Sequence, residues 1–215
     1  MGAAAIRVHC PKFSYLHEKT GRTISDIDLA AHSNQWIQLS RILQDNGFAI
    51  SPYFLHHAHA RLVLEHTTKP KRHVDVFFDK LEMCHVLPLK DRLSADYPTI
   101  PLAELLLEKM QIVRLADKDI IDTILLLREH EVGELDSDTV NSARIAELLS
   151  NDWGFCYTVM SNLRRIRDEC LESLSALTYE DKAVVRSRID VLLDRIEREP
   201  KSLQWRIRAR IGTKR

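Results

Sequence analysis

The sequence has few glycines, and their positions exclude the phosphate-binding loops that depend on this residue. Only six glycines occur among the 215 residues. None of them forms the glycine-rich patterns in which the backbone closely approaches a phosphate, as in P-loop and dinucleotide-binding proteins. We therefore exclude both classes.

Closely spaced cysteines and long apolar runs are also missing. The four cysteines are far apart and form no CxxC pair, so we expect neither a disulfide framework nor a structural zinc site. No apolar run approaches the roughly 18 residues that would indicate a membrane span. The first residues lack the basic-then-apolar layout of an export signal. We expect a cytoplasmic protein with no membrane partner.

The sequence also has no excess of positive or negative charge. Lysine and arginine total 31, aspartate and glutamate also total 31, and the formal charge is zero. The protein as a whole is therefore not attracted to nucleic acid or to a membrane surface. Any electrostatic preference must come from a local group of charges.

Hydrophobic periodicity predicts an N-terminal part that mixes strands and helices and a helical C-terminal part. Period-two patterns indicate strands over residues 24–30, 60–66 and 73–78, with a further strand over 48–54 that a proline interrupts. Patterns of period 3.6 predict helices over residues 2–9, 34–45, 101–114, 118–130, 139–150, 153–173 and 179–198, and residues 11–21 read as irregular. We predict an α/β (α+β) fold, with a mixed-sheet core over residues 1–133 and an all-helical region over residues 134–215.

Two aspartates in the first predicted strand are the strongest candidate site. Asp26 and Asp28 lie two residues apart, which places both carboxylates on one face, with Ile27 and Leu29 on the other face toward the core. Two carboxylates on one face repel each other unless a cation lies between them, and Mg²⁺ prefers such oxygen ligands. The simpler alternative is an exposed strand with acids on its solvent face.

A third acid lies in a similar setting. Asp75 is flanked by Val74 and Val76 in the strand predicted over residues 73–78. If this strand lies beside the first, three carboxylates converge, and such a triad can hold two metal ions about 3.5–4 Å apart. Taken alone, Asp75 also fits a surface acid on an edge strand.

The order of these residues resembles the DNA polymerase β-like nucleotidyltransferase superfamily. Gly2-Ala3 at a helix start precedes the Asp26-Ile27-Asp28 strand, and Asp75 follows on a later strand. The superfamily shows the same order of a small-residue turn, a DxD or DxE strand and a third acid. Gly2-Ala3 stands where its members usually have Gly-Gly or Gly-Ser.

A later segment is similar to the AbiEii-type branch of that superfamily. Lys109 lies on a predicted helix and is followed by Lys118-Asp119-Ile120-Ile121-Asp122, which matches a helical lysine and a basic-Asp-x-x-Asp signature. The branch includes toxin nucleotidyltransferases of toxin–antitoxin and phage-defence systems. The resemblance covers roughly residues 2–130 and implies a nucleotidyltransferase-like core with a C-terminal helical extension.

This resemblance implies an activity and a set of site residues. It implies transfer of a nucleoside monophosphate from a nucleoside triphosphate (NTP) to RNA such as tRNA, to a protein or to a small molecule, with Mg²⁺ or Mn²⁺ as cofactor. A cognate antitoxin would be a further partner. The implied roles are metal binding by Asp26, Asp28 and Asp75, activation of the acceptor hydroxyl by Asp75, phosphate binding by the amides of Gly2 and Ala3, charge neutralisation by Lys109, and nucleotide binding by Asp119 and Asp122.

Other interpretations of these residues remain open. Lys109 also fits a solvated residue paired with nearby acids, and Asp119 and Asp122 fit acids that stabilise a helix N-terminus. Arg22 fits either a phosphate contact or a surface arginine. The alternative function is a catalytically inactive nucleotidyltransferase fold that acts as a nucleic-acid or protein interaction module.

Two further groups of residues are weaker candidates. Histidines are dense over residues 56–85, where His57 and His59 could share a strand face and bind a transition metal. Residues 200–215 contain six basic residues and no acid, a composition that fits an RNA contact or a solvated helix end. Within this tail, Trp205 can stack on a base or pack on the core.

Overall fold

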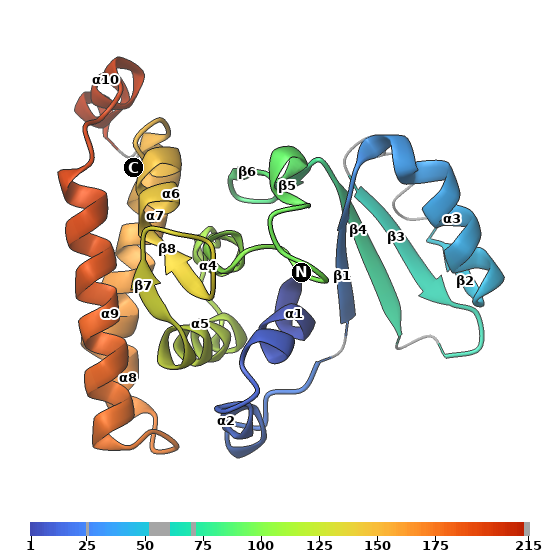
Figure 1. The fold of residues 1–215 in the computed structure, drawn as a ribbon, viewed down its shortest axis with the longest axis horizontal. Helices are drawn as coiled ribbons and strands as arrows, with labels where there is room; N and C mark the ends of the chain where they lie inside the picture. The colour runs from blue at the N-terminus through green and yellow to red at the C-terminus, as the bar shows by residue number, and fades with distance from the viewer. Residues whose placement is uncertain (25, 52–60, 70–71, 213–215) are drawn as a thin grey trace.

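The computed structural model describes residues 1–24, 26–51, 61–69 and 72–212, and it has a mixed α/β fold (Figure 1). Its strands are β1 (Asp26–Ala31), β2 (Phe48–Ile50), β3 (Arg61–His66), β4 (His73–Phe78), β5 (Lys80–Glu82), β6 (Val86–Pro88), β7 (Glu131–Gly133) and β8 (Thr139–Asn141). Its helices of eight or more residues are α1 (Gly2–His9), α3 (Trp36–Asp45), α4 (Leu102–Met110), α5 (Asp117–Glu129), α6 (Ser142–Leu149), α7 (Trp153–Arg165), α9 (Tyr179–Arg198) and α10 (Leu203–Ile211). Shorter helical segments are α2 (Tyr15–Lys19), η1 (Ser33–Gln35), η3 (Lys90–Arg92), the π-helical η4 (Ile166–Cys170) and α8 (Leu171–Ser173).

The main sheet has four strands in the order β1-β4-β3-β2. β1 runs parallel to β4, whereas β4, β3 and β2 pair antiparallel, so the sheet is mixed. β1 is the first strand of this sheet in the chain and forms one of its edges. The parallel pairing places residues from distant segments, such as Asp28 and Asp75, directly side by side.

Helix α3 covers one face of this sheet. Alternate residues of β4, namely Val74, Val76 and Phe78, point toward it and form a small apolar core with Trp36 and other α3 residues. The Trp36 and Phe78 rings lie 4.8 Å apart between centroids. Because side chains alternate along a strand, Asp75 and Phe77 must then point to the opposite face.

The opposite face of the sheet turns toward the helical part of the protein. Helix α1 lies between β1 and the helices α4 and α5 (Figure 1). The larger hydrophobic core contains Ile6 of α1, Phe77 of β4 and side chains from α4, α5, α6, α7 and α9. This core spans the boundary drawn at residue 133, and β7 pairs with β8 across the same boundary.

The strands expected over residues 24–30, 60–66 and 73–78 are present as β1, β3 and β4. Of the strand expected over residues 48–54, the structure has Phe48–Ile50, and residues 52–54 lie outside the described parts of the chain. Ile27 was expected to face the core but is 49% exposed, and the small apolar core under α3 includes Leu29 and Ala31 of the same strand without it.

Other expectations about local structure were wrong. The expected irregular stretch over residues 11–21 contains α2, and the region expected to be helical from residue 138 onward begins with β8. The helix expected to reach residue 114 ends at Met110. Beyond that point the Asn162 side chain donates hydrogen bonds to the carbonyls of Met110 (2.9 Å) and Ile112 (2.8 Å), which holds the chain in a non-helical path.

Membrane-spanning helices are absent from the part of the chain that the structure describes. None of its helices has both the length and the apolar character needed to cross a bilayer.

Candidate functional site

Three aspartates predicted as a metal site lie on one face of the main sheet. In the parallel pairing of β1 with β4, Asp28 is the register partner of Asp75, and Asp26 is the partner of His73. Register partners on adjacent strands project from the same face, and this face is the one opposite α3. The structure therefore brings together acids that the sequence places in two separate segments.

Asp75 is held by an arginine from the neighbouring strand β3. The Arg61 Nη2 atom lies 2.6 Å from Asp75 Oδ2, and the Arg61 guanidinium also lies over the Phe77 ring, 5.1 Å from its centroid. Asp75 is only 6% exposed, and its Oδ1 atom is buried without a hydrogen-bond partner in the described part of the chain. One buried carboxylate oxygen thus remains available on this face.

Gly2 at the start of α1 allows the backbone to lie directly against Asp28. Its φ is +68°, and a Cβ atom placed there would lie 2.1 Å from Asp28 Oδ2. Any larger residue would therefore collide with the carboxylate and would also be strained at this positive φ. A small residue at this position was expected from the sequence, and the close approach to Asp28 is the physical reason for it.

The amide of Gly2 already has a protein partner. Its N–H donates a hydrogen bond to Glu108 Oε2 at 3.0 Å, and the Ala3 residue is buried. Phosphate binding by these two amides stays a prediction, and it requires Glu108 to release the Gly2 N–H. Glu108 itself was not singled out from the sequence, since an acid next to a lysine on a helix gives no signal of such a contact.

Asp28 lies in surroundings that disfavour its ionised form. Burial and the nearby charges of Glu108, Asp26 and Asp75 raise the pKa of Asp28 to about 6, although Lys109 acts in the opposite direction. A cation that enters the site would stabilise the ionised form of this carboxyl.

Lys109 lies among carboxylates at the start of α5 and at the end of its own helix α4. Its Nζ atom lies 3.3 Å from Asp122 Oδ2, 3.6 Å from Glu108 Oε1 and 3.9 Å from Asp119 Oδ1. Burial alone would lower the pKa of Lys109, but Glu108, Asp122 and Asp119 outweigh it and raise the pKa to about 12. Lys109 is therefore a buried, charged lysine rather than a solvated one.

Asp122 binds two cations and a histidine. Besides Lys109, it accepts hydrogen bonds from Arg22 at 3.2 and 3.0 Å, and His17 Nε2 lies 3.1 Å from its Oδ1 atom. Arg22, considered as a phosphate contact from the sequence, is thus engaged with Asp122. Asp119, three residues earlier, has a longer ionic contact with Lys109.

The three aspartates and Lys109 line one cavity of about 450 Å³ between the sheet and the α4–α5 connection, and its lining does not include Gly2, Ala3, Arg22 or Asp122. Its lining combines acids, cations and apolar side chains. The acids are Asp26, Asp28, Asp75, Glu108 and Asp119; the cations are Arg61, Lys109, Arg114 and Lys118; the apolar residues include Phe77, Leu81, Met83 and Ile112. Among the described residues, no three His, Cys, Asp or Glu side chains are grouped closely enough to hold a metal ion as they stand.

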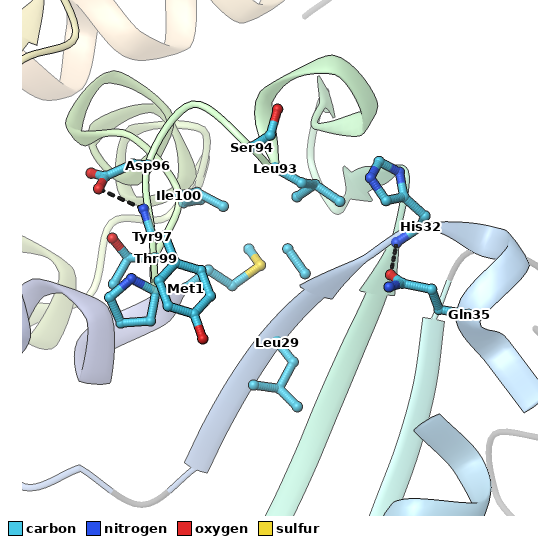
Figure 2. Close-up of a pocket in the computed structure, with 12 residues that line it drawn as sticks. Met1, Leu29, His32, Gln35, Leu93, Ser94, Asp96, Tyr97, Thr99 and Ile100 are labelled. Carbon is cyan, nitrogen blue, oxygen red and sulfur yellow. Dashed lines mark hydrogen bonds between the residues drawn. The ribbon is translucent and has the colours of Figure 1, made fainter. Parts of the chain in front are cut away.

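A second cavity, of about 360 Å³, lies beside β1 and the segment before α4 (Figure 2). Leu29, His32 and Gln35 line one side, and Leu93 and Tyr97 lie across from them (Figure 2). The lining also includes Asp96, whose Oδ1 atom accepts a hydrogen bond from the Tyr97 N–H. The first cavity, with its paired acids and cations, is the better candidate site.

The weaker candidates lie apart from this cavity or outside the described residues. His57 and His59 fall on residues that the structure does not describe, as do Lys214 and Arg215 of the basic tail. Helix α10 of the tail packs on α7 at the far end of the helical part from the sheet (Figure 1). Trp205 packs against the main core, as one of the two interpretations expected.

Comparison with known proteins identified no relative. No family model, no curated protein and no solved structure matches the chain.

Proposed function

We propose that this protein is a Mg²⁺-dependent nucleotidyltransferase with a nucleotidyltransferase-like core of the AbiEii type. It would transfer a nucleoside monophosphate from an NTP to an acceptor hydroxyl and release pyrophosphate. The observation that supports this most directly is the register pairing of Asp28 with Asp75 on parallel strands, on a face that lines a cavity together with Lys109.

The residues around the acids fit a divalent cation. The pKa of Asp28 is raised by burial and by the like charges of Glu108, Asp26 and Asp75, and the Asp75 Oδ1 atom is buried without a hydrogen-bond partner among the described residues. Both features destabilise the folded protein, and a bound cation would relieve them. Carboxylate oxygens are also the ligands that Mg²⁺ prefers. Asp26, Asp28 and Asp75 would hold the ion, which when bound supplies positive charge at the phosphates and lowers the pKa of a coordinated hydroxyl.

The other side chains of the cavity suit a triphosphate. Lys109 is buried and charged, and Arg114 and Lys118 lie exposed on the cavity's edge, so three cations face one space. Fixed positive charges of this kind stabilise the charge that develops on transferred phosphoryl groups. Arg61 occupies Asp75 Oδ2 and so leaves Oδ1 for the ion; the attacking hydroxyl, its pKa lowered by the ion, would release its proton to solvent.

Label transfer tests this proposal directly. The protein is incubated with Mg²⁺, cell extract and each of the four NTPs labelled on the α-phosphate, and the RNA, protein and small-molecule fractions are then counted. We expect label above that of extract alone in one acceptor fraction with at least one NTP. When the γ-phosphate is labelled instead, the label should leave as pyrophosphate, and no acceptor should gain label above that of extract alone. The γ-label separates nucleotidyl transfer from phosphoryl transfer.

Two variants define the role of the site. Asp75→Asn removes the charge of the paired acid, and we expect it to abolish transfer. Asp79→Asn is the matched control, because Asp79 lies just after the same strand at a φ of 59° that asparagine tolerates, and it is not among the residues that line the cavity. Equal transfer by the wild type and Asp75→Asn, or no transfer by the wild type to any fraction, would contradict the proposal.

A further inference from the structure

Two segments contribute apolar side chains to the lining of the acidic cavity that the proposed chemistry does not use, and we call these segments its two walls. Met83 lies at the tip of the β5–β6 hairpin and is 53% exposed, and Ile112 lies in the α4–α5 connection. Leu81 and Phe77 line the cavity as well, and both are buried in the main core. Because more than half of the Met83 surface faces solvent beside a charged cavity, this side chain is available to a ligand.

Helix α7 fixes the wall that carries Met83. The imidazole of His85, two residues after Met83, stacks on the Phe155 ring with centroids 5.0 Å apart and an interplanar angle of 7°. The His85 Nε2 atom also lies 2.8 Å from Thr158 Oγ1. The hairpin tip is therefore tied to α7 by a ring contact and a hydrogen bond.

The same face of α7 fixes the wall that carries Ile112. Asn162 donates hydrogen bonds to the carbonyls of Met110 and Ile112, and it lies four residues after Thr158, on the same side of the helix. Gln111 joins the two walls, because its Oε1 atom accepts a hydrogen bond from the His85 N–H at 3.3 Å. Protein contacts thus hold both walls in place without a ligand, as expected of a preformed binding site.

We infer that these walls receive the nucleobase of the NTP, between Met83 and Ile112, while the triphosphate extends to the cations and acids inside. This inference rests on the proposed function and adds how the substrate is held. Methionine suits the role because its flexible, polarizable thioether packs well against an aromatic face. Since methionine and isoleucine side chains offer no strong hydrogen-bonding group to a base edge, these walls bind a base by its face, whichever base it is.

Binding measurements with and without a base test the inference. The titrations use Mg²⁺ with two non-transferable nucleotides, the α,β-methylene analogues of ATP and CTP, and with inorganic tripolyphosphate, which has the charge but no base. We expect Met83→Ala to weaken both nucleotides about fivefold, because alanine cannot reach the base face and the apolar area buried there becomes smaller. Tripolyphosphate binding should stay unchanged. Val86→Ala is the matched control, because Val86 is an exposed residue of the same hairpin and is not among the residues that line the cavity.

The possible outcomes separate this inference from the proposed function. If Met83→Ala leaves nucleotide affinity unchanged, or weakens nucleotides and tripolyphosphate equally, the base does not contact this wall, although the proposed function stands. A weakening that Val86→Ala reproduces would also overturn the inference, because the hairpin as a whole would then be responsible. If the wild type binds neither the nucleotides nor tripolyphosphate, both the inference and the proposed function fail.

Discussion

Asp119 and Asp122 look equivalent in the sequence, yet the structure predicts that they affect stability in opposite ways. Both lie on the buried side of α5, three residues apart, and both face Lys109. Burial alone would raise the pKa of Asp122, but His17, Lys109 and Arg22 outweigh it and lower the pKa to about 2. Burial raises the pKa of Asp119, and its cationic neighbours do not compensate.

The magnitude for Asp122 follows from linkage between protonation and folding. Its pKa falls from 3.8 in the unfolded chain to about 2 in the folded one. At about 1.36 kcal/mol per pH unit, this difference stabilises the folded state by about 2 kcal/mol. Because the folded pKa is the lower one, the contribution is fully present above about pH 4 and disappears as the pH falls through 2.

We therefore expect Asp122→Asn to lower the free energy of unfolding at pH 7 by about 2 kcal/mol or more, since Arg22 and Lys109 also lose their shared partner. The difference from the wild type should shrink as the pH falls from 4 toward 2. Asp119→Asn should instead leave stability at pH 7 unchanged or raise it, because the folded protein no longer holds a carboxylate whose ionised form burial disfavours.

Urea unfolding between pH 2.5 and 7, followed by circular dichroism, measures both variants against the wild type. The slope of free energy against urea concentration must stay constant across variants for the comparison to hold. Parallel pH profiles for Asp122→Asn and the wild type would refute the assignment of Asp122 as the low-pKa partner of these cations. Equal destabilisation by the two variants would refute the distinction between the two aspartates.

Two further predictions concern buried contacts. Glu104 is fully buried and accepts hydrogen bonds from Arg92 and Arg144. Glu104→Gln should therefore lower the free energy of unfolding in urea by about 3 kcal/mol. Glu147 is an exposed partner of Arg144, and Glu147→Gln should lower it little. Asn162→Ala should cost about 1–3 kcal/mol, because the carbonyls of Met110, at the end of α4, and of Ile112 lose the donor on Asn162. Hydrogen exchange should then rise at the α4–α5 connection while α9 stays protected, and unchanged exchange at the connection would contradict this role.

Part of the candidate site could be predicted from residue spacing. Period two placed Asp26 and Asp28 on one face and marked Asp75 as an acid within a buried strand, and both strands formed where the pattern predicted. The same local reasoning missed β5, β6, β7 and β8, because a strand of three residues is too short to show a period. It also missed Glu108, whose contact with Gly2 joins residues 106 positions apart.

Local sequence patterns were sufficient for the longer helices, the three main strands and the side of each strand on which an acid projects, because these follow from propensity and periodicity within one segment. Packing in three dimensions was needed to establish that Asp75 lies beside Asp28 and that Arg61 holds Asp75. It was also needed to show that Asp122 contacts two cations, Arg22 and Lys109, and His17, whereas Asp119 has the longer contact with Lys109. Such differences arise from strand order, burial and contacts between distant segments, none of which a local pattern contains.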